Sequence, residues 1–272
     1  MYIDTHAHLN FKAFDEDRDE VIKRSLANDT WMINPSSNYK TSKLAVEIAQ
    51  RYEAGVFASV GLHPINCVID LSQADEDRLE ELDIEKYKEL AKMPKVVAVG
   101  EIGLDYWNEP KTKAKSEQFK QKQKEVFLKQ LQLAYELDLP VILHCRKAHD
   151  DLITLLIQSY DEDGPHKIGG VLHCFTGAWE QAQKLLDMGF YLGFNGIIFK
   201  YNVDEIIKKT PLDRMLIETD CPFLTPLGVN VERNEPINVK YVAQRIADIR
   251  GESLGEIAQA TTKNAKKLFR LT

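Results

Sequence analysis

The chain has 272 residues, of which 44% are hydrophobic and 28% are charged, with a formal net charge of -7. This composition predicts a soluble globular protein that is long enough to bury a large core. It argues against a broad nucleic-acid-binding surface, because such surfaces are normally basic. A phosphate group would have to be bound locally, by a metal or by a few cations.

The cysteine pattern and the absence of an apolar span predict a cytoplasmic protein with no membrane attachment. No apolar run approaches the ~20 residues that cross a bilayer, and the chain starts in strand-like sequence rather than in a secretory leader. The four cysteines (Cys67, Cys145, Cys174 and Cys221) are far apart and form no Cys-x-x-Cys pair, which indicates reduced thiols.

A β-rich run, a turn and an amphipathic stretch recur along the chain. The predicted strands are Tyr2–His6, Trp31–Asn34, Val56–Val60, Val96–Glu101, Val141–His144, Gly170–His173, Tyr191–Asn195 and Met215–Glu218. The predicted helices include Asp15–Ala27, Thr41–Tyr52, Asp75–Lys92, Ser116–Leu137, Trp179–Met188 and Leu254–Leu268. Eight such units predict a parallel sheet closed into a TIM (β/α)8 barrel, with an open doubly wound sheet as the alternative. No linker divides the chain, so we expect one domain over residues 1–272.

Two histidines follow each other at a spacing of two in the first predicted strand. Side chains alternate along a strand, so His6 and His8 lie on one side, with Asp4 below them. Two imidazoles at one strand end form half of a metal site, since zinc, manganese and iron all accept imidazole. The pair taken alone could equally be two solvated histidines at a strand exit.

Other predicted strands also end in residues that bind metals. Glu101, His144, His173 and Asp220 all fall at or just beyond such ends. Active sites of TIM barrels lie at the carboxyl ends of the strands, so these side chains should face the cavity that His6 and His8 face. The sequence therefore predicts a metal centre, rather than separately solvated polar strand ends.

Six successive motifs resemble those of the TatD family of metal-dependent deoxyribonucleases. They are Asp4-Thr5-His6-Ala7-His8, Gly61-Leu62-His63-Pro64, Gly100-Glu101-Ile102-Gly103-Leu104-Asp105-Tyr106, Pro140-Val141-Ile142-Leu143-His144-Cys145-Arg146, His173-Cys174-Phe175-Thr176-Gly177 and Glu218-Thr219-Asp220-Cys221-Pro222. They cover nearly the whole chain in the family's order. The resemblance implies a TIM barrel that hydrolyses DNA with divalent metals, as a 3′-to-5′ exonuclease.

The resemblance also implies which residues bind the metals. It assigns His6, His8 and Asp220 to a first ion and His144 and His173 to a second, with Glu101 bridging both. The two divalent ions could be magnesium, manganese or zinc. Two such ions suit phosphodiester cleavage, because one activates the attacking water and the other stabilises the leaving oxygen.

Further residues are predicted to act on the substrate. Asp220 is a candidate general base or water-orienting group, and Glu101 is catalytic through its shared charge. His63 and Arg146 are expected to contact the substrate phosphate, with His63 also catalytic, although His63 could simply be a turn histidine before Pro64.

The loop after the eighth predicted strand departs from the family pattern. It keeps Arg233-Asn234-Glu235-Pro236 and lacks the Arg-Gly-Lys that usually begins this segment, so Arg233 is its remaining candidate phosphate ligand. DNA with free 3′ ends is the expected partner, and the protein is expected to be a monomer. The alternatives are a hydrolase of another bond, such as an aminoacyl-tRNA ester deacylase or a cyclic amidase, and an inactive binding protein, against which the complete ligand set counts.

Several rim features have two interpretations. The lysines Lys111, Lys113, Lys115, Lys120, Lys122 and Lys124 could contact DNA or merely be solvated. Trp107 and Phe223 could stack on nucleobases or anchor their own loops. Cys145, Cys174 and Cys221 each follow a proposed ligand, so on a strand they should point to the opposite face and pack there.

Overall fold

The structure is a computed structural model that describes residues 1–67, 80–159 and 168–272. Within these residues, the strands form one parallel sheet in the order β1-β2-β3-β4-β5-β6-β7-β8. They are β1 Tyr2–Asp4, β2 Thr30–Asn34, β3 Val56–Val60, β4 Val96–Asp105, β5 Val141–Arg146, β6 Gly170–Leu172, β7 Tyr191–Phe194 and β8 Met215–Ile217. Each predicted strand is present, with ends that differ by a few residues.

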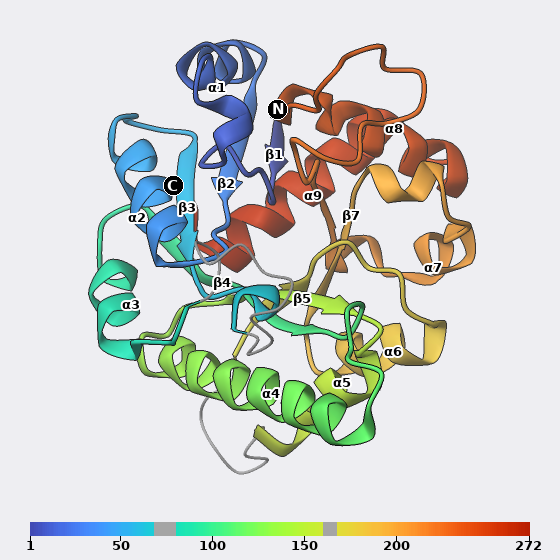
Figure 1. Ribbon diagram of the computed structural model, residues 1–272. Helices are drawn as coiled ribbons and strands as arrows, with labels where there is room; N and C mark the ends of the chain where they lie inside the picture. The colour runs from blue at the N-terminus through green and yellow to red at the C-terminus, as the bar shows by residue number, and fades with distance from the viewer. Residues whose placement is uncertain (68–79, 160–167) are drawn as a thin grey trace.

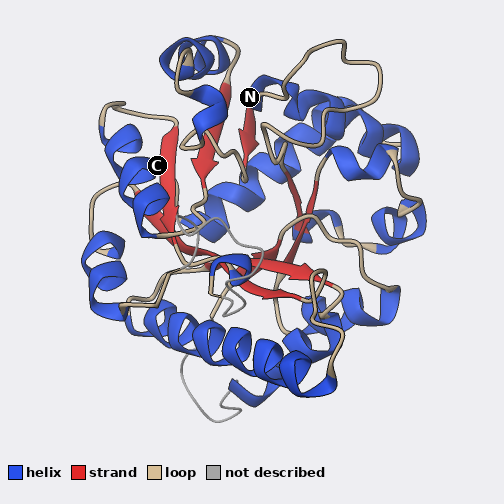
Figure 2. Cartoon of the chain, viewed as in Figure 1, coloured by secondary structure: helices blue, strands red, loops and turns tan. Residues whose placement is uncertain are grey.

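The first and last strands approach each other and nearly close the sheet. The amide of Thr5 donates to the carbonyl of Ile217 over 3.2 Å, and Ala7 forms a parallel bridge with Cys221. Helices surround the strands on the outside, as Figure 2 shows. The prediction of a TIM barrel is therefore confirmed over an open doubly wound sheet.

The helices alternate with the strands around the barrel (Figure 1). They are α1 Arg18–Ala27, α2 Tyr39–Gln50, α3 Ile84–Ala91, α4 Lys113–Glu136, α5 His149–Ser159, α6 Trp179–Asp187, α7 Asp204–Lys209, α8 Val239–Arg250 and α9 Leu254–Phe269. Side-chain caps set several starts: Ser253 accepts from the amide of Glu256, whose carboxylate accepts from the amide of Ser253. The prediction of a helix over Asp75–Lys92 is confirmed only for its later part, because α3 begins at Ile84, residues 80–83 are not helical, and residues 75–79 lie outside the described residues.

The interior of the barrel is filled by one buried apolar side chain from each strand. These are Ile3, Ile33, Phe57, Ala98, Ile142, Val171, Tyr191 and Leu216. The C-terminal helix α9 covers this layer at the amino ends of the strands, because Leu268 and Phe269 belong to the same buried cluster. A second layer of apolar side chains packs the sheet against the outer helices. Among the described residues, α9 covers one end of the interior, which leaves the carboxyl ends of the strands as the end where TIM barrels bind ligands.

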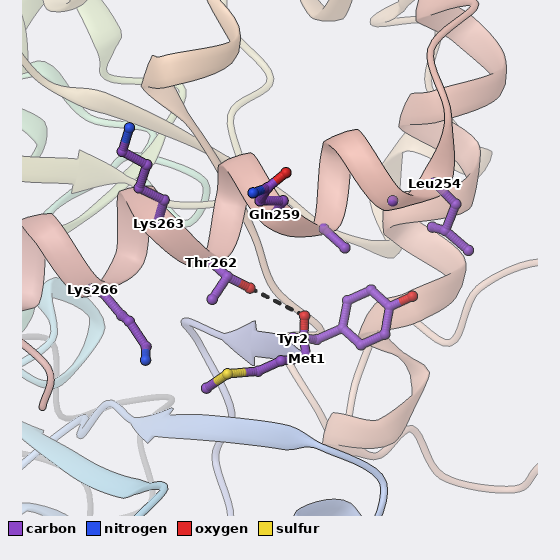
Figure 3. A pocket seen from close by; sticks show the side chains of 9 residues that line it. Met1, Tyr2, Leu254, Gln259, Thr262, Lys263 and Lys266 are labelled. Atoms are coloured by element: carbon purple, nitrogen blue, oxygen red, sulfur yellow. Dashed lines mark hydrogen bonds between the residues drawn. The ribbon is translucent and has the colours of Figure 1, made fainter.

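The opposite end of the barrel carries an open pocket of ≈ 780 Å³ between the chain start and α9 (Figure 3). Met1, Tyr2, Ala258 and Thr262 line it, and the Thr262 hydroxyl donates to the carbonyl of Met1 over 3.2 Å. Strand β1 runs away from this pocket towards His6. Among the described residues, no helix is long and apolar enough to cross a membrane.

Candidate metal centre

The junction between β1 and β8 brings the first three candidate ligands together. The buried carboxylate of Asp4 accepts hydrogen bonds from the amide of His6 at 3.2 Å and from the amide of Thr219 at 2.9 Å. The amide of Asp220 then donates to the carbonyl of His6 over 2.8 Å. As a result, Asp220 Oδ1 lies 3.8 Å from His6 Nε2 and 3.4 Å from His8 Nε2, and the two imidazole nitrogens are 3.1 Å apart.

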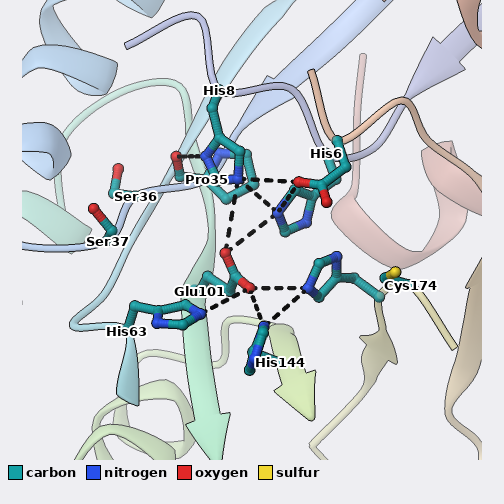
Figure 4. Close-up of polar contacts among 12 residues, drawn as sticks. His6, His8, Pro35, Ser36, Ser37, His63, Glu101, His144 and Cys174 are labelled. Atoms are coloured by element: carbon teal, nitrogen blue, oxygen red, sulfur yellow. Dashed lines mark hydrogen bonds and ion pairs between the residues drawn. The ribbon is translucent and has the colours of Figure 1, made fainter. Parts of the chain in front are cut away.

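Glu101 occupies the centre of the site because β4 is irregular at this residue. The pairing of β4 with β5 shifts register between Gly100 and Ile102, which leaves Glu101 out of the ladder, and its amide donates instead to the carbonyl of Ser36 over 3.1 Å. Such a shift redirects the side chain of the residue that it skips. Figure 4 shows the Glu101 carboxylate surrounded by the histidines.

The two oxygens of Glu101 face different partners. Oε2 lies 3.3 Å from His6 Nε2 and 3.8 Å from His8 Nε2. Oε1 lies 2.8 Å from His144 Nδ1 and 2.9 Å from His173 Nε2. One carboxylate therefore separates the histidines into two pairs, with one oxygen directed at each pair.

Hydrogen bonds on the outer ring nitrogens leave the inner nitrogens free to accept a cation. His8 Nδ1 lies 3.2 Å from the carbonyl of Pro35, and His144 Nε2 lies 3.0 Å from Asp105 Oδ2. The inner nitrogens also face acceptors, Asp220 for His8 and Glu101 for His144, so a cation bound there would leave the proton of each neutral ring on its outer nitrogen. His173 Nδ1 faces Glu218 Oε1 at 3.4 Å without a hydrogen-bond partner among the described residues. This arrangement of second partners is the usual one for metal-binding histidines.

The spacing of the donor atoms also fits divalent cations. Two nitrogen or oxygen ligands at ~2.0–2.2 Å from a tetrahedral ion are separated by roughly 3.3–3.6 Å. Three sets of side chains have their donor atoms within 4.8 Å of one another. They are His6, His8 and Asp220; His6, Glu101 and His173; and His63, Glu101 and His144. The donors, four imidazoles and two carboxylates besides His63, suit zinc or manganese.

The electrostatics of the site favour carboxylate anions and a proton shared among the histidines. Burial opposes charge on Glu101, but His173, His63 and His6 outweigh it and hold the pKa of this carboxyl well below its usual value. Burial likewise opposes charge on His173, and Glu101 overcomes this, so the pKa of His173 is raised well above 6.5. A divalent cation would replace that proton when it binds.

Two carboxylates that support the ligands were not identified from the sequence. Asp105 holds His144 from behind, and Glu218, which is fully buried, faces His173 and accepts from the amide of Cys174 over 2.7 Å. Gly193 makes room for Glu218, because a Cβ there would come within 2.6 Å of Glu218 Oε2. Both acids belong to the quoted motifs, but their spacing to the histidines they support has no sequence signature.

His63 reaches the centre from the turn after β3. Its Nε2 lies 3.4 Å from Glu101 Oε1, and its Nδ1 accepts from the amide of Ile65 over 3.1 Å. Because Nδ1 is the acceptor, the neutral ring carries its proton on Nε2. Burial lowers the pKa of His63, which keeps the ring neutral at neutral pH. His63 is therefore a hydrogen-bond donor at the edge of the site.

The two arginines have different surroundings. Arg146 is bound to Asp105, with Nη2 and Oδ2 2.8 Å apart, and 43% of its side chain is exposed next to the metal centre. Arg233 is not at the centre. Its guanidinium donates to Asp17 over 2.9 Å and 2.6 Å, and it lies 4.1 Å from the centre of the Phe14 ring.

Other rim residues also have definite positions. Trp107 and Phe223 are exposed by 56% and 54%, so neither anchors its loop by burial. Several of the lysines are already paired, among them Lys120 with Glu109 at 2.9 Å, Lys124 with Asp151 at 2.8 Å and Lys113 with Glu117 at 3.9 Å. No cysteine belongs to a ligand set among the described residues, and burial raises the pKa of Cys174 to about 12, which disfavours the thiolate that would bind a metal.

Comparison with known proteins places TatD-related, metal-dependent hydrolases over nearly the full length of the chain. A family model described as TatD related DNase matches residues 3–270. A Bacillus subtilis protein named uncharacterized metal-dependent hydrolase YabD is 42% identical, with 100% of both chains covered. A Shigella flexneri protein named 3′-5′ ssDNA/RNA exonuclease TatD is 33% identical, with 98% of both chains covered.

Solved structures of TatD-family proteins also resemble this chain. The TatD homologue YjjV from Escherichia coli K12 superposes with a TM-score of 0.84 at 31% identity, covering 100% of this chain and 98% of that chain. A TatD-family hydrolase from Entamoeba histolytica gives a TM-score of 0.81 at 27% identity, with the same coverage. This chain belongs to the TatD family of metal-dependent hydrolases.

Proposed function

We propose that this metal-dependent hydrolase cleaves phosphodiester bonds of DNA from the 3′ end, using two divalent cations that share Glu101. The observation that carries the proposal is the division of the site by this one carboxylate, with Oε2 3.3 Å from His6 and Oε1 2.9 Å from His173. In this assignment His6, His8 and Asp220 bind one cation and His144 and His173 bind the other. Such ions would supply an activated water and stabilise negative charge on the leaving oxygen.

The side chains around the ligands supply the remaining functions. Asp220 is 16% exposed at the mouth of the site, so its carboxylate can orient or deprotonate a water that enters there. Burial opposes charge on Asp220, but His8, His6 and His173 outweigh it and lower the pKa of Asp220, so the carboxylate is ionised at neutral pH. His63 Nε2 is a donor, which suits an oxygen of the substrate phosphate.

Arg146 is the best candidate for the phosphate contact. It is the arginine beside the metal centre, and a planar guanidinium can bind Asp105 on one edge while its exposed part meets a phosphate. Arg233 is proposed to contribute indirectly, because Asp17 already accepts from both of its terminal nitrogens.

The named relatives support the nucleic-acid assignment. The Shigella flexneri relative carries an exonuclease name, whereas the Bacillus subtilis relative is named only as a metal-dependent hydrolase. The engagement of Arg233 by Asp17 and the net charge of -7 leave few cations for a polyanion, which favours an uncharged ester or amide as the second candidate substrate.

The two candidates are separated by comparing substrates directly. Metal-reconstituted protein is incubated with end-labelled single- and double-stranded DNA and with a panel of aminoacyl esters and cyclic amides. The proposal expects the highest kcat/KM on a DNA end, with products that shorten from the 3′ terminus. A higher kcat/KM on an ester or amide than on every DNA end would replace it with the second candidate.

A further inference from the structure

Asp105 lies at the end of β4 and connects the metal centre to an exposed aromatic ring. Its side chain is 3% exposed, yet three residues contact its carboxylate. Behind it, Oδ2 lies 3.0 Å from His144 Nε2. In front, the carboxylate accepts from Arg146 Nε over 3.1 Å and 3.0 Å, and Oδ1 accepts from the amide of Trp107 over 2.9 Å. One carboxylate thus fixes a metal ligand, a cation and the base of the Trp107 loop.

Trp107 is exposed although it is large and apolar. Its exposed fraction of 56% leaves more than half of the residue in contact with solvent, which core packing does not explain. Two cations approach its ring: Arg146 Cζ lies 5.1 Å from the ring centre and Lys147 Nζ lies 4.4 Å from it. An aromatic surface next to two positive charges matches a nucleotide, in which a flat base is joined to a negatively charged phosphate.

Arg146 is already paired with Asp105, whereas the other acidic side chains nearby are paired with lysines other than Lys147. Glu109, in the same loop as Trp107, is paired with Lys120 at 2.9 Å. Asp151, at the start of α5, accepts from Lys124 and from the Tyr106 hydroxyl, each over 2.8 Å. Within the described residues, Lys147 has no carboxylate partner inside 4.0 Å, so a phosphate could bind it without displacing an existing ion pair.

We propose that Trp107, Arg146 and Lys147 form a binding subsite for one unpaired nucleotide of a single strand, positioned beside the metal centre by Asp105. This inference rests on the proposed nuclease function and assigns the residues that hold one nucleotide of the strand next to the metal centre. Trp107 stacks on the base, and Arg146 and Lys147 bind the phosphates on either side. A paired base in a duplex is already stacked on both faces, so it cannot use the indole without first being unstacked.

The experiment measures kcat and KM for four proteins, the wild type and the variants Trp107→Ala, Trp107→Phe and Tyr135→Ala. Tyr135 is the control, because it is an exposed aromatic near the carboxyl end of α4, at the opposite end of the barrel. On single-stranded oligonucleotides, Trp107→Ala should raise KM by roughly 5- to 150-fold with little change in kcat, as expected for one lost base stack. Trp107→Phe should retain most of the affinity, and Tyr135→Ala should match the wild type.

Abasic substrates test whether Trp107 acts on a base. A set of oligonucleotides carries a single abasic site at the first, second, third or fourth nucleotide from the 3′ end. At one position in the set, the wild type should lose affinity and the difference between the wild type and Trp107→Ala should disappear. On a blunt duplex of the same sequence, Trp107→Ala should have a smaller effect than on the single strand.

Lys147 is tested by the salt dependence of KM. Lys147→Ala should reduce the slope of log KM against log salt by roughly 0.7, which corresponds to one single-strand phosphate. Lys266 is the matched control, because its Nζ also lies over an indole ring, 4.7 Å from the centre of Trp31, but on α9 at the far end of the barrel. Lys266→Ala should leave the slope unchanged.

The outcomes separate the subsite from the proposed function. If the wild type degrades single-stranded DNA while Trp107→Ala keeps the wild-type KM, or loses affinity equally for every abasic substrate, the subsite is wrong and the nuclease function stands. If the wild type cleaves no nucleic acid, the proposed function fails and the subsite fails with it.

Discussion

Glu101 on β4 and His173, which follows β6, form a buried contact between a carboxylate and an imidazole, with Oε1 and Nε2 2.9 Å apart and both side chains at least 94% buried. Burial alone would lower the pKa of His173, but the adjacent anion outweighs it and raises this pKa well above 6.5. In the absence of metal, the pair therefore holds a proton at neutral pH.

Metal uptake should consequently release a proton and become tighter as pH rises. Because the pKa of metal-free His173 is raised, affinity should continue to increase above pH ~6.5, the ordinary pKa of histidine, and level off only beyond the raised value. Competition titrations with manganese or zinc between pH 5.5 and 9 measure this. An affinity that is already constant from pH 6.5 upwards would show that no proton is displaced from His173.

Glu101→Gln should remove at least one metal ion. The amide keeps the size of the side chain but loses the charge that both cation positions face, at 3.3 Å from His6 and 2.8 Å from His144. Cys174→Ser is the matched control, because its thiol contacts Asn195 at 3.6 Å rather than a ligand. Elemental analysis of both purified proteins decides, and equal losses of metal would place Cys174 among the ligands.

Asp105→Asn should weaken metal binding without removing a ligand. Asp105 can only accept, so it can hold the His144 proton on Nε2 while a cation binds Nδ1, the nitrogen that faces Glu101 at 2.8 Å. An asparagine amide can donate instead, which favours the other tautomer and places a proton where the cation should bind. We expect roughly a 10- to 100-fold loss of metal affinity. Unchanged affinity, measured by competition with a chelating dye, would mean that packing alone orients His144.

Substitution of Arg146 should affect substrate binding, whereas substitution of Arg233 should affect stability. Arg146→Ala should remove a charge-assisted contact worth ~1.5–3 kcal/mol and lower kcat/KM on DNA by roughly 10- to 150-fold while metal content is retained. Hydrolysis of an uncharged ester, which offers no anion, should change little. Equal losses on both substrates would indicate that Arg146 serves only to hold Asp105.

Arg233→Ala should act mainly on stability. Its pair with Asp17 joins the loop after β8 to the segment before α1, and about a third of Asp17 is in solvent, so we expect a loss of about 1 kcal/mol or less. Hydrogen bonding to Arg233 lowers the pKa of Asp17, so this contribution is present above the unfolded pKa of aspartate and is lost as pH falls through the lowered value. The difference in unfolding free energy between the wild type and the variant should therefore shrink in acid. A difference that grows below pH 4 would contradict this pairing.

The barrel could be predicted from the sequence because each repeating unit combines a short β-rich run with a turn and an amphipathic stretch. That periodicity is local, and the carboxyl ends of parallel strands meet by geometry alone. The same rule places His6, Glu101, His144 and Asp220 at one rim, and the structure brings these side chains together.

The supporting contacts could not be predicted, because they depend on distances across the barrel. Asp17 and Arg233 are 216 positions apart, and nothing in either local pattern indicates their pairing. The same holds for Glu218 behind His173 and for the register shift that turns Glu101 inwards. The position of the proton on His63 could not be predicted either, because it depends on the amide of Ile65, which donates a hydrogen bond to Nδ1.

The most direct test of a metal-dependent nuclease centre is the cleavage of a 5′-labelled single-stranded oligonucleotide by chelator-treated protein as divalent metal is restored. We expect no cleavage without metal, then a ladder that shortens from the 3′ end as the metal is added back, and no ladder from Glu101→Gln under the same conditions. A ladder of equal rate from the chelator-treated protein or from Glu101→Gln would contradict a hydrolytic centre built around this carboxylate.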